Sequence, residues 1–414
     1  MNKWVIVSLV FIGMFLSGAN AQNTSQLRQE LQKIKDEYKN DMKKVWDDIN
    51  SLQKDQSDTK VKLAEDFDAT IQKYLKESGK DPISWKDIVS APNKIKFYGF
   101  IRLDFDYDTH RTNGGNNASF VLNRASGGND EELNIHARMT RFGFDLVGGK
   151  LSTIGNPDLS GKFEIDFFNG GSESRNALRM RHAYLQLKWN EYDLSLLAGQ
   201  TSDIVSPLVP ETVEVASVFR DIGNTGDRRP QLRVEWAPAI IKGTKEEETR
   251  LFFTLGLLRA GAVDGLDADA DGNNDGEDSG APMIQGRIGI ATPGWVEGQK
   301  IRFGAYMSHA WYDTQTRVGL RGEREFVSHF YGIDLVVPIT DRIEFSTEWW
   351  WGYDVSDLRG GIAQGVDTIK GDEIEAAGGW FNLKIKTTER STVALGYGVD
   401  NPVNGDIGPG GRLK

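Results

Sequence analysis

The chain has 414 residues, no cysteine, 46 glycines and a formal net charge of −11 at pH 7. The lack of cysteine excludes disulfide bonds, thiol catalysis and cysteine–zinc sites, and the negative charge argues against nucleic acid as a partner. The mean hydropathy is −0.45. Beyond the amino terminus no stretch approaches the roughly 20 apolar residues of a membrane-spanning helix, which excludes a helical membrane protein.

Residues 1–21 have the features of a secretory signal peptide. Lys3 supplies the charged start, residues 5–16 form an apolar run, and Ala19, Asn20 and Ala21 form a small-residue cleavage site. The apolar run is too short to be a spanning helix. We therefore expect an exported protein whose mature chain begins after Ala21.

Residues 22–78 carry apolar side chains at heptad spacing, the pattern of an α-helical coiled coil. These side chains are Leu27, Leu31, Ile34, Tyr38, Met42, Val45, Ile49, Leu52, Leu63, Phe67, Ile71 and Tyr74. A single helix of this length cannot bury such a stripe, so we expect self-association. The alternative is a helix that packs along a globular partner. Gly79 and Pro82 end the helical pattern, and residues 79–93 form the predicted linker.

From residue 94 onward the apolar side chains recur at every second position, the period of a β-strand with one apolar face. Thirteen such runs follow one another, at residues 94–107, 133–147, 162–168, 178–189, 193–201, 231–236, 250–259, 284–291, 301–309, 327–337, 342–353, 373–385 and 392–399. The alternation changes phase near Thr140 and His182. We expect a bulge or bend at both places.

The connections between the runs are often long and polar after odd-numbered runs and short after even-numbered ones, as in an outer-membrane barrel. With the signal peptide, this predicts an all-β transmembrane antiparallel barrel over residues 94–414. We place it in the bacterial outer membrane, with the coiled coil in the periplasm. A large soluble β-sandwich is the alternative. Bacterial barrels have even strand numbers, so we expect about sixteen strands when complete, the carboxyl-terminal ones being missing from this sequence.

Three short motifs resemble those of a known family. Residues 137–145 read Ala-Arg-Met-Thr-Arg-Phe-Gly-Phe-Asp, residues 179–184 read Arg-Met-Arg-His-Ala-Tyr, and the first run opens Phe-Tyr-Gly-Phe at residues 97–100. With a leader and a coiled coil ahead of the barrel, the chain resembles the DcaP-like trimeric porins. The resemblance implies a homotrimer, a periplasmic coiled coil, a 16-stranded barrel and a preference for small anionic organic solutes.

Residues 202–229 follow the fifth run, where porins of this kind fold a loop into the channel as a constriction. This segment carries Glu211, Glu214 and Arg220, and the alternative is an ordinary exposed loop. The runs also offer arginines that we expect on the pore wall: Arg138, Arg141, Arg179, Arg181, Arg233, Arg287 and Arg302. Opposing charges orient and select solutes in a water-filled pore, although any barrel needs polar residues on its inner side.

The loop at residues 267–278 has the spacing of a calcium loop, with carboxylates at loop positions 1, 3, 5, 9 and 12 and glycine at position 6. The candidate ligands are Asp267, Asp269, Asp271, Asp275 and Asp278. Position 12 is Asp where Glu is usual, and no helical pattern flanks the loop. An acidic hydrated surface loop is the alternative, and no other cofactor is expected.

We expect a water-filled channel for small polar, chiefly anionic solutes, and not an enzyme. The five histidines show no spacing typical of a catalytic triad. The expected surroundings are outer-membrane lipid and lipopolysaccharide. Two other functions stay open: a structural tether from the outer membrane to the peptidoglycan through the coiled coil, and an outer-membrane hydrolase.

Overall fold

The computed structural model describes residues 32–33, 43–44, 94–112, 122, 130–151, 154–169, 171–172, 175–212, 222–244 and 247–407. The chain divides into two compact units, Met1–Lys86 and Asp87–Lys414. The predicted signal peptide and linker lie outside the described residues, as does the predicted coiled coil except for two helical pieces at residues 32–33 and 43–44. Among the described helices, none has the length and apolar character needed to cross a membrane.

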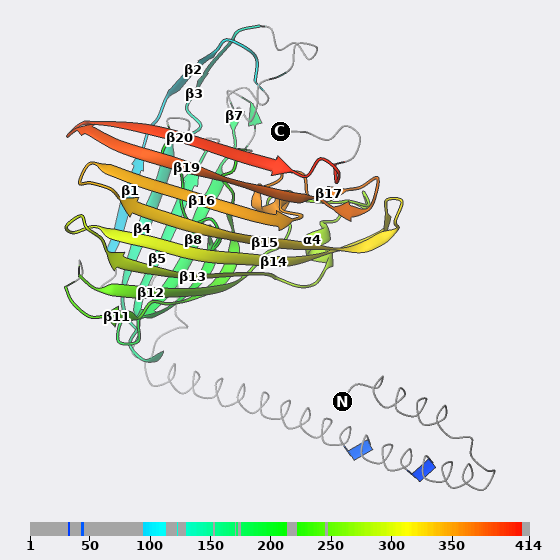
Figure 1. The fold of residues 1–414 in the computed structure, drawn as a ribbon, viewed down its shortest axis with the longest axis horizontal. Helices are drawn as coiled ribbons and strands as arrows, with labels where there is room; N and C mark the ends of the chain where they lie inside the picture. The colour runs from blue at the N-terminus through cyan, green and yellow to red at the C-terminus, as the bar shows by residue number, and fades with distance from the viewer. Residues whose placement is uncertain are drawn as a thin grey trace, which may run out of the picture. The chain divides into compact units, whose positions relative to one another are not determined.

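The second unit is built on a 14-stranded antiparallel sheet, shown in Figure 1. Thirteen of its strands follow one path. In path order they are β1 (Lys94–Phe100), β4 (Arg141–Lys150), β5 (Asp158–Asp166), β8 (Arg179–Trp189), β9 (Leu194–Ser202), β10 (Arg228–Trp236), β12 (Thr249–Leu258), β13 (Met283–Pro293), β14 (Lys300–Val318), β15 (Glu323–Pro338), β16 (Ile343–Tyr353), β19 (Glu375–Thr388) and β20 (Ser391–Pro402).

The remaining elements are short and lie off this path. They are β2 (Asp104–Asp108), β3 (Glu132–His136), β6 (Gly171–Ser172), β7 (Arg175–Asn176), β11 (Ala239–Ile241), which pairs with β12, α4 (Asp275–Asp278), the 3-10 helix η4 (Ser356–Leu358), β17 (Val366–Asp367) and β18 (Asp372–Glu373). Each of the thirteen predicted runs overlaps one strand of the path, so the predicted large antiparallel sheet is confirmed. Its closure into a sixteen-stranded barrel stays a prediction.

Both predicted phase changes correspond to irregularities of the sheet. Residues 137–140 separate β3 from β4, and the amide of Thr140 donates to the carbonyl of Ala137 at 3.0 Å. In β8 the register with β5 shifts, because Glu164 pairs with His182 whereas Ile165 pairs with Met180. Arg181 is the extra residue of this bulge. Consequently His182 and both arginines that flank Met180 are turned to the same side of the sheet.

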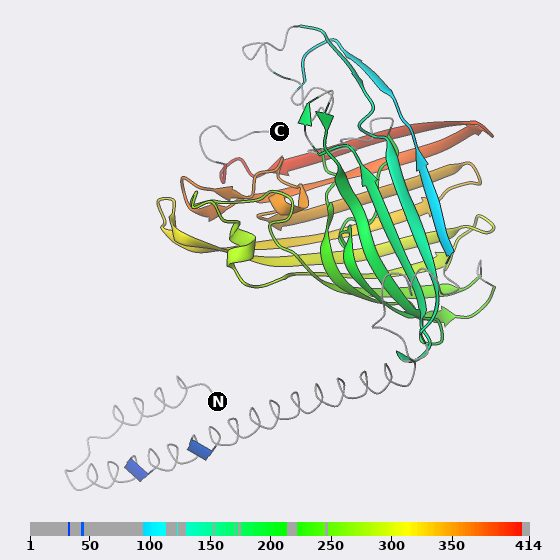
Figure 2. The ribbon, with the colours of Figure 1, turned by 180° about the vertical axis from the view of Figure 1, so that it is seen from behind.

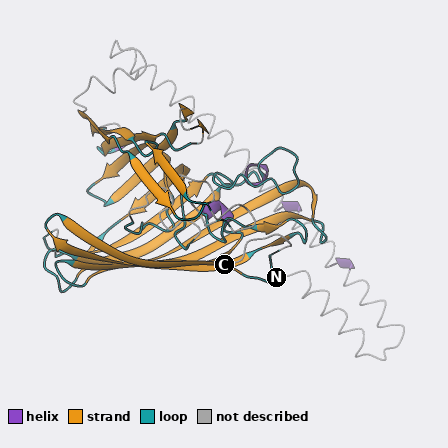
Figure 3. Cartoon of the chain, turned by 90° about the horizontal axis from the view of Figure 1, so that it is seen from above, coloured by secondary structure: helices purple, strands orange, loops and turns teal. Residues whose placement is uncertain are grey.

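The sheet has one apolar outer face and one inner face that is partly covered by loops. Phe97, Leu255 and Ile288 are 77%, 59% and 53% exposed on the outer face, as expected for the predicted barrel, whose outer face would carry an apolar band. Seen from above, the sheet curves around loop segments on its concave side (Figure 3). Here Ile204 and Val355 from two loops join the buried core formed by inner-face side chains.

Candidate functional site: the inner wall of the sheet

Two acidic side chains on β5 gather three arginines on the inner face. Asp166 accepts from Arg179 twice, from Nε at 2.9 Å and from Nη2 at 2.7 Å. Arg181 donates from Nε to Glu164 Oε1 at 2.6 Å and from Nη1 to Asp166 Oδ2 at 3.1 Å. The Nε atom of Arg141 lies 3.5 Å from Glu164 Oε1. We call these five residues the arginine cluster.

The arginine cluster exists because strand register brings distant residues opposite one another. Arg141 of β4 pairs with Asp166 of β5, which pairs in turn with Arg179 of β8. Arg181 lies two residues beyond Arg179 in β8 and is therefore on the same side of the sheet. Because Arg181 is the extra residue of the bulge, His182 lies on that side too. Arg141 and Asp166 are 25 residues apart in the sequence, so the order of residues alone does not reveal that these side chains lie close together.

The carboxylates of the arginine cluster are more deeply buried than its guanidinium groups. The side chains of Asp166 and Glu164 are 0% and 8% exposed, whereas those of Arg179 and Arg141 are 27% and 19% exposed. The carboxylates thus lie beneath the guanidinium groups and hold them in place. The surface offered to the interior is positive.

The segment at residues 203–212 and 222–227 lies against the opposite part of the inner face. The amide of Ile204 donates to Gln285 Oε1 at 2.7 Å, and the amide of Leu208 donates to Glu348 Oε1 at 2.8 Å. Glu211 forms an ion pair with Lys384 at 2.5 Å. The segment therefore contacts β13, β16 and β19 in turn. An ordinary exposed loop would not make such contacts with the inner face of the sheet.

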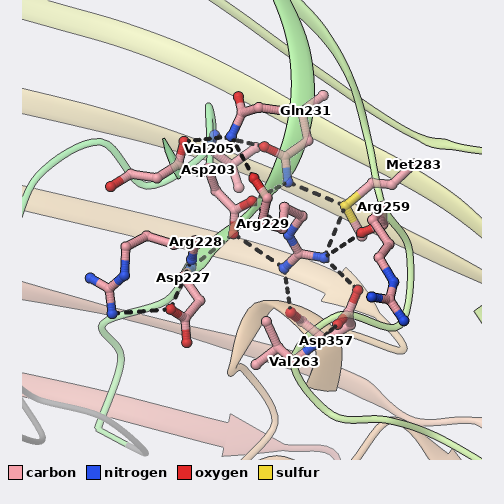
Figure 4. A network of polar contacts seen from close by, with 12 residues as sticks. Asp203, Val205, Asp227, Arg228, Arg229, Gln231, Arg259, Val263, Met283 and Asp357 are labelled. Carbon is pink, nitrogen blue, oxygen red and sulfur yellow. Dashed lines mark hydrogen bonds and ion pairs between the residues drawn. The ribbon is translucent and has the colours of Figure 1, made fainter. Parts of the chain in front are cut away.

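The two ends of this segment meet at a buried arginine, shown in Figure 4. Arg229 is completely buried and donates from Nε to Asp203 Oδ1 at 2.7 Å. Its Nη1 donates to Asp357 Oδ2 at 2.6 Å and its Nη2 to the carbonyl of Asp357 at 2.7 Å. Asp357 also accepts from Tyr312 Oη at 3.2 Å. The network joins the segment to the loop that contains η4.

The carboxyl groups beside Arg229 have shifted pKa values. Burial raises the pKa of Asp203 above its usual range, although Arg229 opposes this shift. The pKa of Asp227 lies below its usual range, because the effect of burial, which alone would raise it, is outweighed by the positive charges of Arg359 and Arg228. The amide of Asp227 donates to Asp203 Oδ2 at 2.8 Å, so the two carboxylates belong to one anchored structure.

The acidic loop brings three of its five predicted ligands together. Oxygen atoms of Asp267, Asp269 and Asp275 all lie within 4.8 Å of one another. Asp275 is 1% exposed, and burial, followed by the charges of nearby aspartates, raises its pKa to about 6. Asp271 and Asp278 are outside this group. The short helix α4 begins inside the loop at Asp275, with Asn274 as its N-cap, a helix that the sequence pattern did not indicate.

The side chains of the other predicted pore residues have partners outside the arginine cluster. Arg287 is held by Asp334 at 2.9 and 2.7 Å, Arg233 donates to Gln231 Oε1 at 3.0 Å, and Arg138 donates to Asn176 at 2.9 Å. Arg302 occupies an exposed position on β14, opposite Ala291 of β13. The predicted Glu214 and Arg220 lie outside the described residues.

Residues 28–237 match a protein family described as DcaP outer membrane protein. The match covers slightly more than half of the chain. The chain belongs to the DcaP outer membrane protein family. The resemblance seen in the three short motifs is thereby confirmed. No curated protein sequence matches the chain.

One solved outer-membrane channel shares the fold of this DcaP-family chain, and other solved outer-membrane proteins match it less closely. The crystal structure of the outer membrane channel DcaP of Acinetobacter baumannii has a TM-score of 0.56 and 18% sequence identity, covering 76% of this chain and 80% of that one. Outer-membrane expressed OmpT of Vibrio cholerae has a TM-score of 0.43 and 10% identity, covering 77% and 79%. A trimer form of in-vitro folded Vibrio cholerae OmpT has a TM-score of 0.36 and 10% identity, covering 76% and 90%.

Family membership places the DcaP-family chain in the bacterial outer membrane and makes it a porin-type protein, as the sequence predicted. It also confirms that the chain is not an enzyme and removes the hydrolase alternative. Arg229 and Asp357 were not among the site residues predicted from the sequence. Arg229 lay in the candidate loop segment, but its partner is 128 residues away, and no local pattern signals such a pair.

Proposed function

We propose that this protein forms a water-filled channel through the outer membrane that passes small polar solutes and prefers anions that carry carboxylates. The arginine cluster carries the proposal. Its three guanidinium groups face two carboxylates, so one positive charge remains, and the groups left partly exposed are the arginines. A guanidinium presents a planar pair of donors that matches a carboxylate.

The segment at residues 203–212 and 222–227 supports a selective channel. In this proposal it narrows the pore on the side opposite the arginine cluster, because it is bonded to the inner wall at Gln285, Glu348 and Lys384. A solute would then pass between the arginines of one wall and the segment on the other. Fixed charges at a narrow, water-filled passage select by sign.

Reversal potentials in planar bilayers under a potassium chloride gradient test the proposal. We expect the purified protein to conduct with a reversal potential of the sign that reports chloride preference. The same membranes with an added gradient of a small dicarboxylate should show permeation of that anion. A purified, inserted protein that does not conduct, or that prefers potassium, would contradict the proposal.

We further propose that the complete protein is a homotrimer, with residues 22–78 as a periplasmic coiled coil after removal of residues 1–21. The support is the heptad pattern, whose apolar stripe needs copies of itself for burial, and a barrel trimer brings three such helices onto one axis. The barrel would comprise the chain from residue 94 onward.

The acidic loop is proposed to bind Ca²⁺ through Asp267, Asp269 and Asp275. Support comes from the convergence of their oxygens within 4.8 Å and from oxygen donors, which Ca²⁺ prefers. Asp275 is buried among like charges, and a bound cation would stabilise its ionised form.

A further inference from the structure

The strands β2 and β3 form a two-stranded ribbon separate from the main sheet. Figures 1 and 2 show this ribbon projecting beyond the end of the main sheet. Its register pairs Asp104 with His136 and Asp106 with Asn134. One face of the ribbon is apolar and exposed, with Phe105 66% and Leu133 56% exposed. The other face carries the polar side chains, and a two-stranded ribbon alone is marginally stable in water.

His136 is enclosed on the polar face between two carboxylates. Its side chain is only 4% exposed, with Nδ1 3.8 Å from Asp104 Oδ2 and Nε2 3.3 Å from Asp106 Oδ2. Among the described residues, neither His136 Nδ1 nor Asp104 Oδ2 has a hydrogen-bond partner, and both atoms are buried. Two buried polar atoms therefore face each other without a bond.

The distance of 3.8 Å is too long for a hydrogen bond between them. The guanidinium of Arg102 contacts the other oxygen of that carboxylate, Asp104 Oδ1, at 2.6 Å from Nε and at 2.5 Å from Nη2. Asp106 Oδ2 lies 3.3 Å from His136 Nε2, and its negative charge favours the tautomer that is protonated at Nε2. In that tautomer His136 Nδ1 carries a lone pair that faces the oxygen Asp104 Oδ2. Both atoms are hydrogen-bond acceptors, and burying them without a donor is unfavourable.

We propose that Asp104 and His136 bind a divalent first-row transition metal such as Zn²⁺ between Asp104 Oδ2 and His136 Nδ1. An imidazole nitrogen and a carboxylate oxygen suit zinc, whereas calcium prefers oxygen alone. Tetrahedral zinc holds such a pair of ligand atoms about 3.4 Å apart, so the two side chains need to approach by less than half an ångström.

Asp106 acts as the positioning residue of this site. Histidines that bind metals usually donate their other ring N–H to a carboxylate, which fixes the tautomer and orients the ring. The metal joins β2 to β3 through one ligand from each strand. It thereby stabilises a ribbon whose two strands pair only with each other in the part of the chain that the structure describes.

Zinc titration of the full detergent-solubilised chain, after removal of metals with EDTA, tests the site. Titration calorimetry with ZnCl₂ is performed in an Asp267→Asn, Asp275→Asn background, so that the acidic loop does not contribute. We expect one saturable site that Asp104→Asn and His136→Gln each remove, with at least a tenfold loss of affinity. Asp108→Asn, the matched control, removes the same charge from the same face of β2 and should bind zinc as before.

Two further measurements separate coordination from folding. Co²⁺ in place of zinc should give visible absorption bands that His136→Gln abolishes, and Asp106→Asn should weaken zinc binding without removing those bands. Far-ultraviolet circular dichroism shows that each variant retains its sheet. Zinc binding that persists in both Asp104→Asn and His136→Gln, or no saturable zinc site in the parent protein, would overturn the proposal.

Discussion

At the residue scale, the guanidinium groups of Arg179 and Arg181 should set the sign of selectivity. Replacing both by Ala leaves Arg141 with two buried carboxylates, so the local charge changes from positive to negative. We expect the chloride-to-potassium permeability ratio to fall about fivefold or more, the effect of roughly 1 kcal/mol. Reversal potentials measure the change. The control Arg342→Ala, Arg390→Ala removes two arginines from exposed turns, and an equal shift in that variant would contradict the assignment.

The pH response of the acidic loop rests on Asp275. Its pKa, about 6 in the folded loop, lies above the usual value, so protonation is favoured as pH falls through 6. Calcium needs the ionised carboxylate. We therefore expect the apparent Ca²⁺ affinity to decrease about tenfold between pH 7 and pH 5, because one proton competes with the ion. Calorimetry at both pH values measures this decrease.

Two variants of the acidic loop give the control for that measurement. Asp267→Ala should abolish calcium binding, whereas Asp271→Ala should retain most of it, since Asp271 lies outside the group of three converging carboxylates. Calcium affinity that is equal at pH 7 and pH 5 would show that Asp275 is not a ligand.

At the scale of the element, Arg229 should hold the segment at residues 203–212 and 222–227 against the wall. Arg229→Gln leaves the buried carboxylates of Asp203 and Asp357 without their cation, and breaking a buried pair in this way costs roughly 3–5 kcal/mol. We expect larger and noisier single-channel conductance and a lower unfolding temperature. Arg259→Gln is the matched control, because its half-exposed side chain pairs only at the surface with Glu277. Unchanged conductance in Arg229→Gln would contradict an anchoring role.

The strands were largely predictable, and the contacts between loops and wall were not. Alternation of apolar side chains marks every strand of the path and even the bulge at Arg181, because a strand with one apolar face follows a local period. The predicted runs at 301–309 and 327–337 were too short. β14 continues to Val318 and β15 begins already at Glu323. In this extension the register shifts between Asp313 and Val318, so the alternation of apolar side chains is no longer regular.

The candidate site was predictable only in part, because the spacing of residues within one strand does not show which residues of the neighbouring strands lie opposite them. Arg141, Arg179 and Arg181 were identified by residue type, and the structure brings them together on β4 and β8. Glu211 of the candidate constriction segment pairs with Lys384, 173 residues away in the sequence, a contact that no local pattern signals. The Arg229–Asp357 contact likewise depends on the start of β10 and the loop that contains η4, which meet only in the folded sheet.

At the scale of the whole molecule, net charge and pore preference need not agree. Much of the acidic charge of the chain lies away from the arginine cluster, for example in residues 267–278. Screening over about 8 to 10 Å at physiological salt removes distant charges from the field at a narrow passage. A chain of net charge −11 is therefore compatible with a channel that prefers anions, because the nearest fixed charges decide.

Assembly is the last property to test at this scale. The heptads of residues 22–78 predict three helices on one axis, and the exposed apolar outer face of the sheet offers a second surface for contact between copies. Native mass spectrometry of the detergent-solubilised protein should give the mass of three chains. Removing residues 22–78 should lower the dissociation temperature of the trimer without abolishing it, because the walls of the barrels still pack. A uniform monomer of the full chain would show that neither the heptads nor the outer face drives association.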